Sequence, residues 1–145
     1  MIQVKYPIAL VSVYLWIGFV CAISFMEAWL KFRASGVTVS IGLNIGRLVF
    51  NALNKVEWVF AIAIFADLII SKNIFLSMQI LLKKETIFYL IPLILLIIQT
   101  FWTLPALDKR AEMYIENLPM PASYLHFYYV AMEALKVGCL FIFGI

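Results

Sequence analysis

PIALVSVYLWIGFVCAISFM (residues 7–26) is a run of twenty residues without a charged side chain. A helix of about 20 residues crosses the hydrocarbon core of a bilayer, which is ~30 Å thick. The run lacks the apolar–polar alternation of a strand in a membrane barrel. It therefore predicts a transmembrane helix. Because it continues into SFMEAWLKF without a small-residue cleavage site, we expect it to be retained rather than removed as a signal peptide.

The rest of the chain has the same composition. Of its 145 residues, 66% are hydrophobic and 13% are charged, whereas a soluble domain is roughly half apolar and a quarter charged. Three further apolar runs are long enough to span a bilayer. The sequence therefore predicts a multi-pass, all-α integral membrane protein, a single domain of four transmembrane helices in an up-down bundle, with helices over residues 7–32, 47–71, 86–107 and 122–145.

The charges exclude some classes of function. The net charge of +3 is spread over loops and helix ends, so it does not form the basic stripe of a nucleic-acid-binding protein. No second histidine or cysteine stands at metal-ligand spacing from His126, and we expect no metal site. Cys21 and Cys139 lie in apolar runs, where a thiol packs as a small hydrophobic group. Loop charges favour neither membrane orientation.

Helix breakers predict the connections. Pro92 predicts a kink in the third helix, Pro105 predicts its end, and Ser123 is a candidate cap for the fourth. The glycine-containing stretch SGVTVSIGLNIGR (35–47) predicts a flexible connection that a ligand or another subunit can approach closely. SKNIFLSMQILLKKE (71–85) is too short to span, and predicts a helical extension or an interfacial turn.

Most polar residues near or within the apolar runs fall at one end of the predicted bundle. In an up-down bundle, the ends of helices one and three and the starts of helices two and four meet at the same membrane face. An ionisable group inside a membrane helix costs at least ~2.5 kcal/mol unless it faces protein or water. The sequence therefore predicts a buried polar pocket for a small molecule at one face.

Helical spacing places the polar residues of helix two on one face of that helix, and those of helix four on one face of theirs. Arg47, Asn51 and Asn54 lie within roughly 60° of one another at 100° per residue. On helix four, His126, Tyr129, Glu133 and Lys136 lie within an arc of roughly 80°. We predict a ligand-binding set that comprises Glu27, Arg33, Arg47, Asn51, Asn54, Glu57, His126, Tyr129 and Glu133.

The same residues also have structural interpretations. Glu27 with Lys31, and Glu133 with Lys136, have the spacing of local ion pairs on a helix. The asparagines of helix two can form hydrogen bonds between helices. A lone histidine near an interface is more often a packing residue than a ligand. Asp67 stands apart in the far half of helix two, where it is either a proton or cation site or a partner for a neighbouring backbone.

The stretch RLVFNALNKVEW (47–58), with FRAS (32–35) before it, resembles the first half of the membrane-associated proteins in eicosanoid and glutathione metabolism (MAPEG). Members of that family are four-helix membrane proteins of similar length that assemble as trimers and hold glutathione between subunits. The resemblance implies that Asn54 and Glu57 bind glutathione, while Arg33 and Arg47 match in position. An arginine suits the carboxylates of glutathione and a glutamate suits its ammonium.

The chain departs from the family at several positions. It has Asn51 where the family has another arginine, and Trp58 where the family has a tyrosine. QTFWTLPALDKR (99–110) replaces a tyrosine-rich run that ends in the arginine that activates the thiol. If the resemblance extends to catalysis, it implies that Arg110 fills that role, because a fixed cation favours a thiolate. The matching residues lie between 33 and 58.

Two other classes of function stay open. A small proton- or ion-coupled transporter would use Glu57, Asp67, His126 and Glu133 as a relay, since intramembrane ionisable groups often mark such paths. A non-catalytic subunit of a larger membrane complex would need only a partner for its polar faces. Four helices are a small bundle to enclose a site alone, so a homo-oligomer or a larger assembly is expected under each interpretation.

Overall fold

The computed structural model describes residues 6–70, 84–119 and 121–145. Within these ranges all regular secondary structure is helical, which confirms the all-α prediction. The elements are α1 (Pro7–Val20), η1 (Cys21–Glu27), α2 (Ala28–Leu30), η2 (Lys31–Arg33), α3 (Val39–Ile70), α5 (Lys84–Ile98), η4 (Gln99–Thr103), α6 (Leu104–Ile115) and α7 (Leu125–Gly144).

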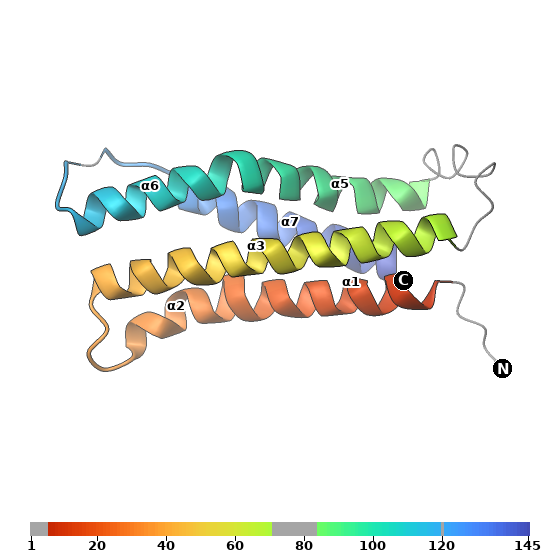
Figure 1. Cartoon of the computed structure of the whole chain (residues 1–145), viewed down its shortest axis with the longest axis horizontal. Coiled ribbons are helices and arrows are strands. Elements are labelled where there is room, and N and C mark those ends of the chain that lie inside the picture. Colours follow the sequence, from red (N-terminus) through yellow and green to blue (C-terminus); the bar gives the residue numbers. More distant parts are fainter. Residues whose placement is uncertain (1–5, 71–83, 120) are drawn as a thin grey trace.

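The described residues form four helical rods that lie side by side (Figure 1). Rod one runs from α1 to η2, rod two is α3, rod three runs from α5 to α6, and rod four is α7. Each rod runs opposite to the previous one (Figure 1). Among the described helices, three are long and apolar enough to cross a membrane: Pro7–Arg33, Ile87–Ile115 and Leu125–Gly144. Of the stretch 71–85, predicted as a helical extension or an interfacial turn, residues 71–83 lie outside the described residues, and Lys84 begins α5.

Rod three is longer than expected, because it continues past Pro105 to Ile115. Proline lacks the N–H of the normal helical hydrogen bond, and its ring clashes with the carbonyl four residues earlier. The π-helical turn η4 ends two residues before Pro105, which therefore stands in the first turn of α6. The N–H of Leu104, the first residue of α6, bonds to Gln99 O five residues back, so the helix is already widened where Pro105 supplies no N–H. Pro92, the predicted kink, lies inside α5, and the helix continues through it.

Rod two begins earlier than expected, at Val39 rather than at residue 47. Thr38 Oγ1 accepts a hydrogen bond from the Ile41 N–H at 3.3 Å, which caps the first turn. Gly42 and Gly46 therefore lie in a helix, and not in a flexible connection. A Cβ at Gly42 would stand 2.1 Å from the ring of Phe32, so the end of rod one packs directly on the backbone of α3.

The apolar core lies between rods one and two and extends to rods three and four. Its buried members include Val13, Trp16, Ile64, Leu96 and Leu140. Such burial contributes about 25 cal/mol for each Å² of apolar surface removed from solvent. The core holds the rods in contact over their central length and leaves their outer faces free.

Asp67 connects rod two to the start of rod one. Its Oδ2 accepts a hydrogen bond from the Ala9 N–H at 2.8 Å. Ala9 lies in the first turn of α1, where N–H groups have no partner inside the helix and a negative charge is favourable. Asp67 therefore acts as a cap supplied by a neighbouring helix, which is the backbone-partner interpretation of this residue. Its use as a relay group stays a prediction.

Replacing Gly42 by leucine should lower stability. The new side chain must displace Phe32 and the last turn of rod one, and overpacking of this kind costs about 1–3 kcal/mol. The matched control is Gly18→Leu, because nothing lies within 4 Å of a Cβ at Gly18. Gly18→Leu should leave the midpoint of thermal unfolding in detergent unchanged or raised. Equal midpoints for both variants would contradict the close packing at Gly42.

Candidate functional site

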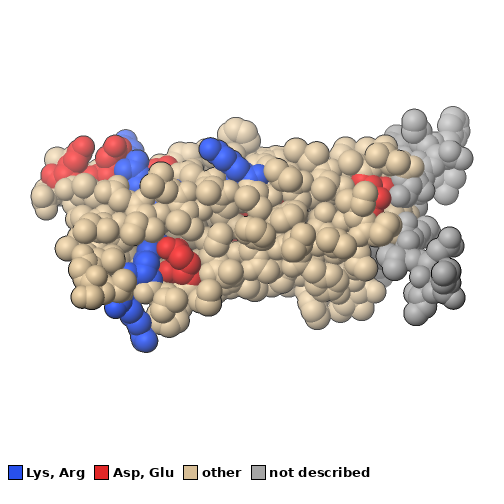
Figure 2. All heavy atoms as spheres, turned by 60° about the horizontal axis from the view of Figure 1, so that its bottom comes forward, with Lys and Arg blue, Asp and Glu red and all other residues tan. Residues whose placement is uncertain are grey.

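The predicted polar residues separate into two main places within the chain. One is a cavity at the end of the bundle where rods one and two are joined, which we call the end cavity. The other is a group of buried side chains that joins all four rods, Trp16, Glu57, Gln99, Glu133 and Lys136, which we call the core cluster. Among the described residues on the face shown in Figure 2, most charged side chains gather at one end of the molecule.

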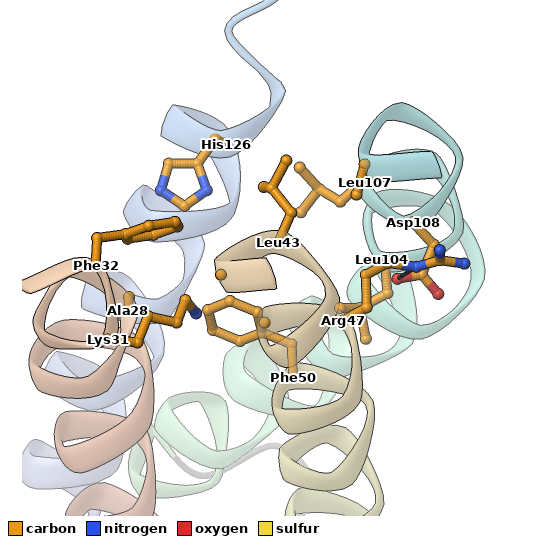
Figure 3. Close-up of a pocket in the computed structure, with 13 residues that line it drawn as sticks. Ala28, Lys31, Phe32, Leu43, Arg47, Phe50, Leu104, Leu107, Asp108 and His126 are labelled. Carbon is orange, nitrogen blue, oxygen red and sulfur yellow. Dashed lines mark ion pairs between the residues drawn. The ribbon is translucent and has the colours of Figure 1, made fainter. Parts of the chain in front are cut away.

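The end cavity has a volume of about 270 Å³ and lies between the end of rod one, the start of α3, the α6 helix and the start of α7 (Figure 3). Most of its surface is apolar. Its lining residues are Ala28, Lys31, Phe32, Gly42, Leu43, Gly46, Arg47, Phe50, Leu104, Leu107, Asp108, Ala111 and His126.

Four polar side chains border the end cavity. His126 lies near Phe32 on one side, and Arg47 lies near Asp108 on the other (Figure 3). The Arg47 Nε is 3.5 Å from Asp108 Oδ1. The Lys31 ammonium lies between these two sides, with its Nζ 5.2 Å from the centre of the Phe50 ring. The cavity therefore combines an apolar lining with three nitrogen-containing side chains and one carboxylate.

Lys31 is held in place by its own helix. Its Nζ is 3.2 Å from Glu27 Oε2, so the predicted ion pair of rod one is confirmed. The Lys31 side chain is only 9% exposed, although Figure 2 shows charged atoms at the surface of this end. Glu27 partly offsets the lysine charge without lining the cavity itself.

The core cluster is a continuous set of hydrogen bonds and ion pairs. Glu57 Oε1 accepts a hydrogen bond from the Trp16 indole N–H at 2.8 Å and another from the Lys136 ammonium. The same ammonium is 3.2 Å from Glu133 Oε2, and Gln99 Nε2 donates to Glu133 Oε1 at 3.0 Å. Every member is at most 1% exposed. One side chain each from rods one, two and three thus meets two from rod four.

The sequence explains part of this arrangement. Glu133 and Lys136 share a helix face at i,i+3 spacing, and their predicted ion pair is confirmed. Gln99 is the first residue of the π-helical turn η4. Trp16 was not identified from the sequence, because a tryptophan in an apolar run normally indicates packing or an interfacial belt. Its only signal is the polar N–H, which needs a partner when buried.

Two asparagines of the predicted set join rod two to rod three. Asn54 Nδ2 donates to Thr100 Oγ1 at 3.0 Å, and the Trp58 indole donates to the same oxygen at 3.0 Å. Asn51 Nδ2 donates to Asp108 Oδ2 at 3.1 Å. These contacts confirm the hydrogen bonds between helices that were one interpretation of the asparagines. Thr100, which the sequence did not single out, is the common partner of Asn54 and Trp58.

The remaining predicted residues lie outside both places or between them. Arg33 stacks on the Trp29 ring at 4.6 Å, and Arg110 Nη2 donates to the Pro121 carbonyl at 2.8 Å. Neither lines the end cavity. Tyr129 is buried beside Glu133, and its ring packs edge-on against Phe50 with 5.3 Å between the ring centres. Since Phe50 lines the end cavity, this ring pair separates the end cavity from the core cluster.

Among the described residues, no three histidine, cysteine, aspartate or glutamate side chains are placed to hold a metal ion together. Comparisons of the chain with protein-family models, with curated proteins and with solved structures find no match. The function is therefore argued from the two polar places and from the apolar outer faces of the rods.

Replacing Lys136 by methionine should lower the free energy of unfolding by about 3–5 kcal/mol, because it leaves buried carboxylates without their ammonium. Adding Glu57→Gln should recover part of this loss, since the double variant removes two interacting partners. Unfolding in mixed detergent micelles measures both effects. Lys55→Met is the control, because Lys55 is an exposed cation on α3 and its loss should change stability by less than about 0.5 kcal/mol. If the double variant loses as much stability as the two single variants together, the result would contradict an interaction between Lys136 and Glu57.

Proposed function

We propose that this chain is a multi-pass membrane protein whose four rods cross the bilayer, and that its end cavity binds a small amphiphilic molecule with an anionic or zwitterionic polar group. The observation that carries the proposal is the composition of the end cavity. An apolar lining with a few converging polar groups is typical of a small-molecule site.

The outer faces of the rods support the membrane part of the proposal. On α3, the rod that carries the most buried polar groups, Leu48, Val59 and Ile62 point outward and are each more than 60% exposed, with the exposed cation Lys55 between them. The other three rods each contain a candidate membrane span. A bilayer can solvate such surfaces, and a rod whose backbone is fully helical satisfies its own hydrogen bonds there.

The polar border of the end cavity supports the ligand class. Lys31, Arg47 and His126 can donate hydrogen bonds to a carboxylate or a phosphate, and Asp108 can accept one from an ammonium. The apolar lining suits a hydrocarbon body. The cavity lies at the end where charged side chains gather (Figure 2), which in a bilayer is the boundary with water. An amphiphile would lie there with its polar group toward that boundary.

The resemblance to the MAPEG family supplies glutathione as one candidate ligand. Arg47 borders the end cavity, but Asn54 and Glu57 use their polar atoms on Thr100, Trp16 and Lys136 within the chain. A fatty acid is the second candidate. Both molecules carry a carboxylate, and only the fatty acid carries a long hydrocarbon chain, so the two can be told apart by experiment. A homo-oligomer, as the resemblance implies, is part of the same proposal.

A labelling experiment tests the four crossings. In a chain with Cys21 and Cys139 replaced by alanine, a membrane-impermeant maleimide should label Ser35→Cys and Ala122→Cys from one side. It should label Ile145→Cys from the opposite side, because four crossings return the chain to the side on which it began. Labelling of positions 35 and 145 from the same side would indicate that only three rods cross, and would overturn this part of the proposal.

Ligand binding should raise the thermal stability of the purified protein. A ligand at about 100 times its dissociation constant stabilises a folded protein by ~2.7 kcal/mol. We expect laurate or glutathione to raise the unfolding midpoint, and dodecanol, which lacks the carboxylate, to have a much smaller effect. Native mass spectrometry gives the number of ligands and of chains in each complex. No shift and no bound mass with either carboxylate would overturn the proposal.

Variants locate the ligand. Lys31→Met removes a cation, and Ala111→Leu fills the end cavity without changing its charge. Each should weaken binding about tenfold, which corresponds to about 1.4 kcal/mol. The matched controls are Lys55→Met and Ala52→Leu, since both residues are exposed on α3 and neither lines the end cavity. Equal effects of the variants and their controls would place the ligand elsewhere.

A further inference from the structure

The core cluster has an imbalance of ionisable groups. It contains the carboxyl groups of Glu57 and Glu133 and the ammonium of Lys136, and each of these residues is at most 1% exposed. Within the described part of the chain, Lys136 is the cation that pairs with both carboxyl groups. With both carboxyl groups ionised, the cluster would carry one negative charge in the apolar interior of the bundle. A buried charge without a partner is strongly unfavourable.

The other groups that face the cluster do not supply a second positive charge. Trp16 of α1 and Gln99 of η4 are neutral hydrogen-bond donors. Tyr129 of α7 lies beside Glu133 and Ser24, and a tyrosine or serine hydroxyl is neutral in this setting. The rods that surround the cluster therefore provide two acids, one base and neutral polar groups.

Unpaired acceptors indicate what completes the cluster. Among the described side chains, three buried oxygens of the cluster accept no hydrogen bond: Glu57 Oε2, Gln99 Oε1 and Glu133 Oε2. Glu133 Oε2 nevertheless has the Lys136 ammonium 3.2 Å away as an ion-pair partner, and Glu133 lies beside the Tyr129 hydroxyl. Buried acceptors in proteins normally have a donor. Glu57 Oε2 and Gln99 Oε1 therefore remain without a donor, and a group with these two acceptors and one surplus acid lacks a hydrogen.

We propose that the core cluster is a proton-binding site, in which Glu57 and Glu133 together hold one proton while Lys136 stays charged. The proton neutralises the surplus negative charge and converts one carboxylate oxygen into a donor. Both carboxyl groups contact the same ammonium, so the proton is assigned to the pair rather than to one residue. The inference does not depend on the ligand of the end cavity, and it would stand if that cavity bound nothing.

Proton release on unfolding tests the inference. Glutamate in an unfolded chain is ionised at pH 7, since its usual pKa is about 4.3. Unfolding the detergent-purified protein with dodecyl sulphate in weakly buffered solution at pH 7 should therefore release the bound proton, which an indicator dye measures. We expect one more proton per chain from the wild type than from Glu57→Gln or Glu133→Gln. In either variant a single carboxylate balances Lys136.

Two further variants test the number of protons that are released on unfolding. Lys136→Met should release one proton more than the wild type, because both carboxyl groups then need a proton. Glu27→Gln, which removes an acid of the partly exposed Lys31 pair, should match the wild type. Infrared spectroscopy gives an independent measurement on the folded proteins. The carbonyl band of a protonated carboxylic acid should be present in the wild type and in Glu27→Gln, and absent from Glu57→Gln and Glu133→Gln.

The opposite results would overturn the inference. In that case the wild type would release no more protons than Glu57→Gln and Glu133→Gln and would lack the carboxylic acid band. Both of its carboxyl groups would then be ionised. The core cluster would then be a fully ionised group rather than a proton site. Because glutamine keeps the size and hydrogen-bonding ability of glutamate, the two glutamine variants are the ones most able to fold, and the conclusion does not require Lys136→Met to fold.

Discussion

Lys136 places an ammonium group where all four rods meet, and the structure around it follows from the need to offset that charge. Glu57 and Glu133 come within ion-pair distance, while Trp16 donates one hydrogen bond to Glu57 and Gln99 donates one to Glu133. Sliding one helix by a single turn of about 5.4 Å would separate these groups. Apolar contacts hold the rods together but tolerate such slides. We therefore interpret the core cluster as the interaction that sets the relative positions of the rods.

The two π-helical turns lie beside this cluster. η1 contains Ser24, which faces Tyr129, and η4 begins at Gln99, whose amide reaches Glu133. A π-helical turn is less favourable than an α-helical one and occurs often at functional sites. In rod three the turn has a second effect, because it precedes Pro105 and the rod continues beyond that residue. The continued helix brings Asp108 to the end cavity.

The polar residues of the end cavity differ in chemistry and in accessibility from those of the core cluster. At the end of the bundle, Lys31, Arg47 and His126 lie near the surface where charged side chains gather, and a ligand can reach them. Deeper in the bundle, the carboxyl groups of Glu57 and Glu133 are enclosed by protein. Phe50 and Tyr129 form the boundary between the two. Arg47 and Glu57, both in the predicted ligand-binding set, are ten positions apart on rod two, which corresponds to about 15 Å along a helix.

The sequence by itself determined the all-α fold class, the apolar rods, and the ion pairs of Glu27 with Lys31 and Glu133 with Lys136, because these depend on composition and on spacing within one helix. It did not determine that α3 begins at Val39 or that rod three passes Pro105, since both depend on contacts from other rods and on the π-helical turn. Nor did it place Trp16 beside Glu57. Pairing between helices depends on which residues face each other at the same depth, and only the tertiary structure decides that.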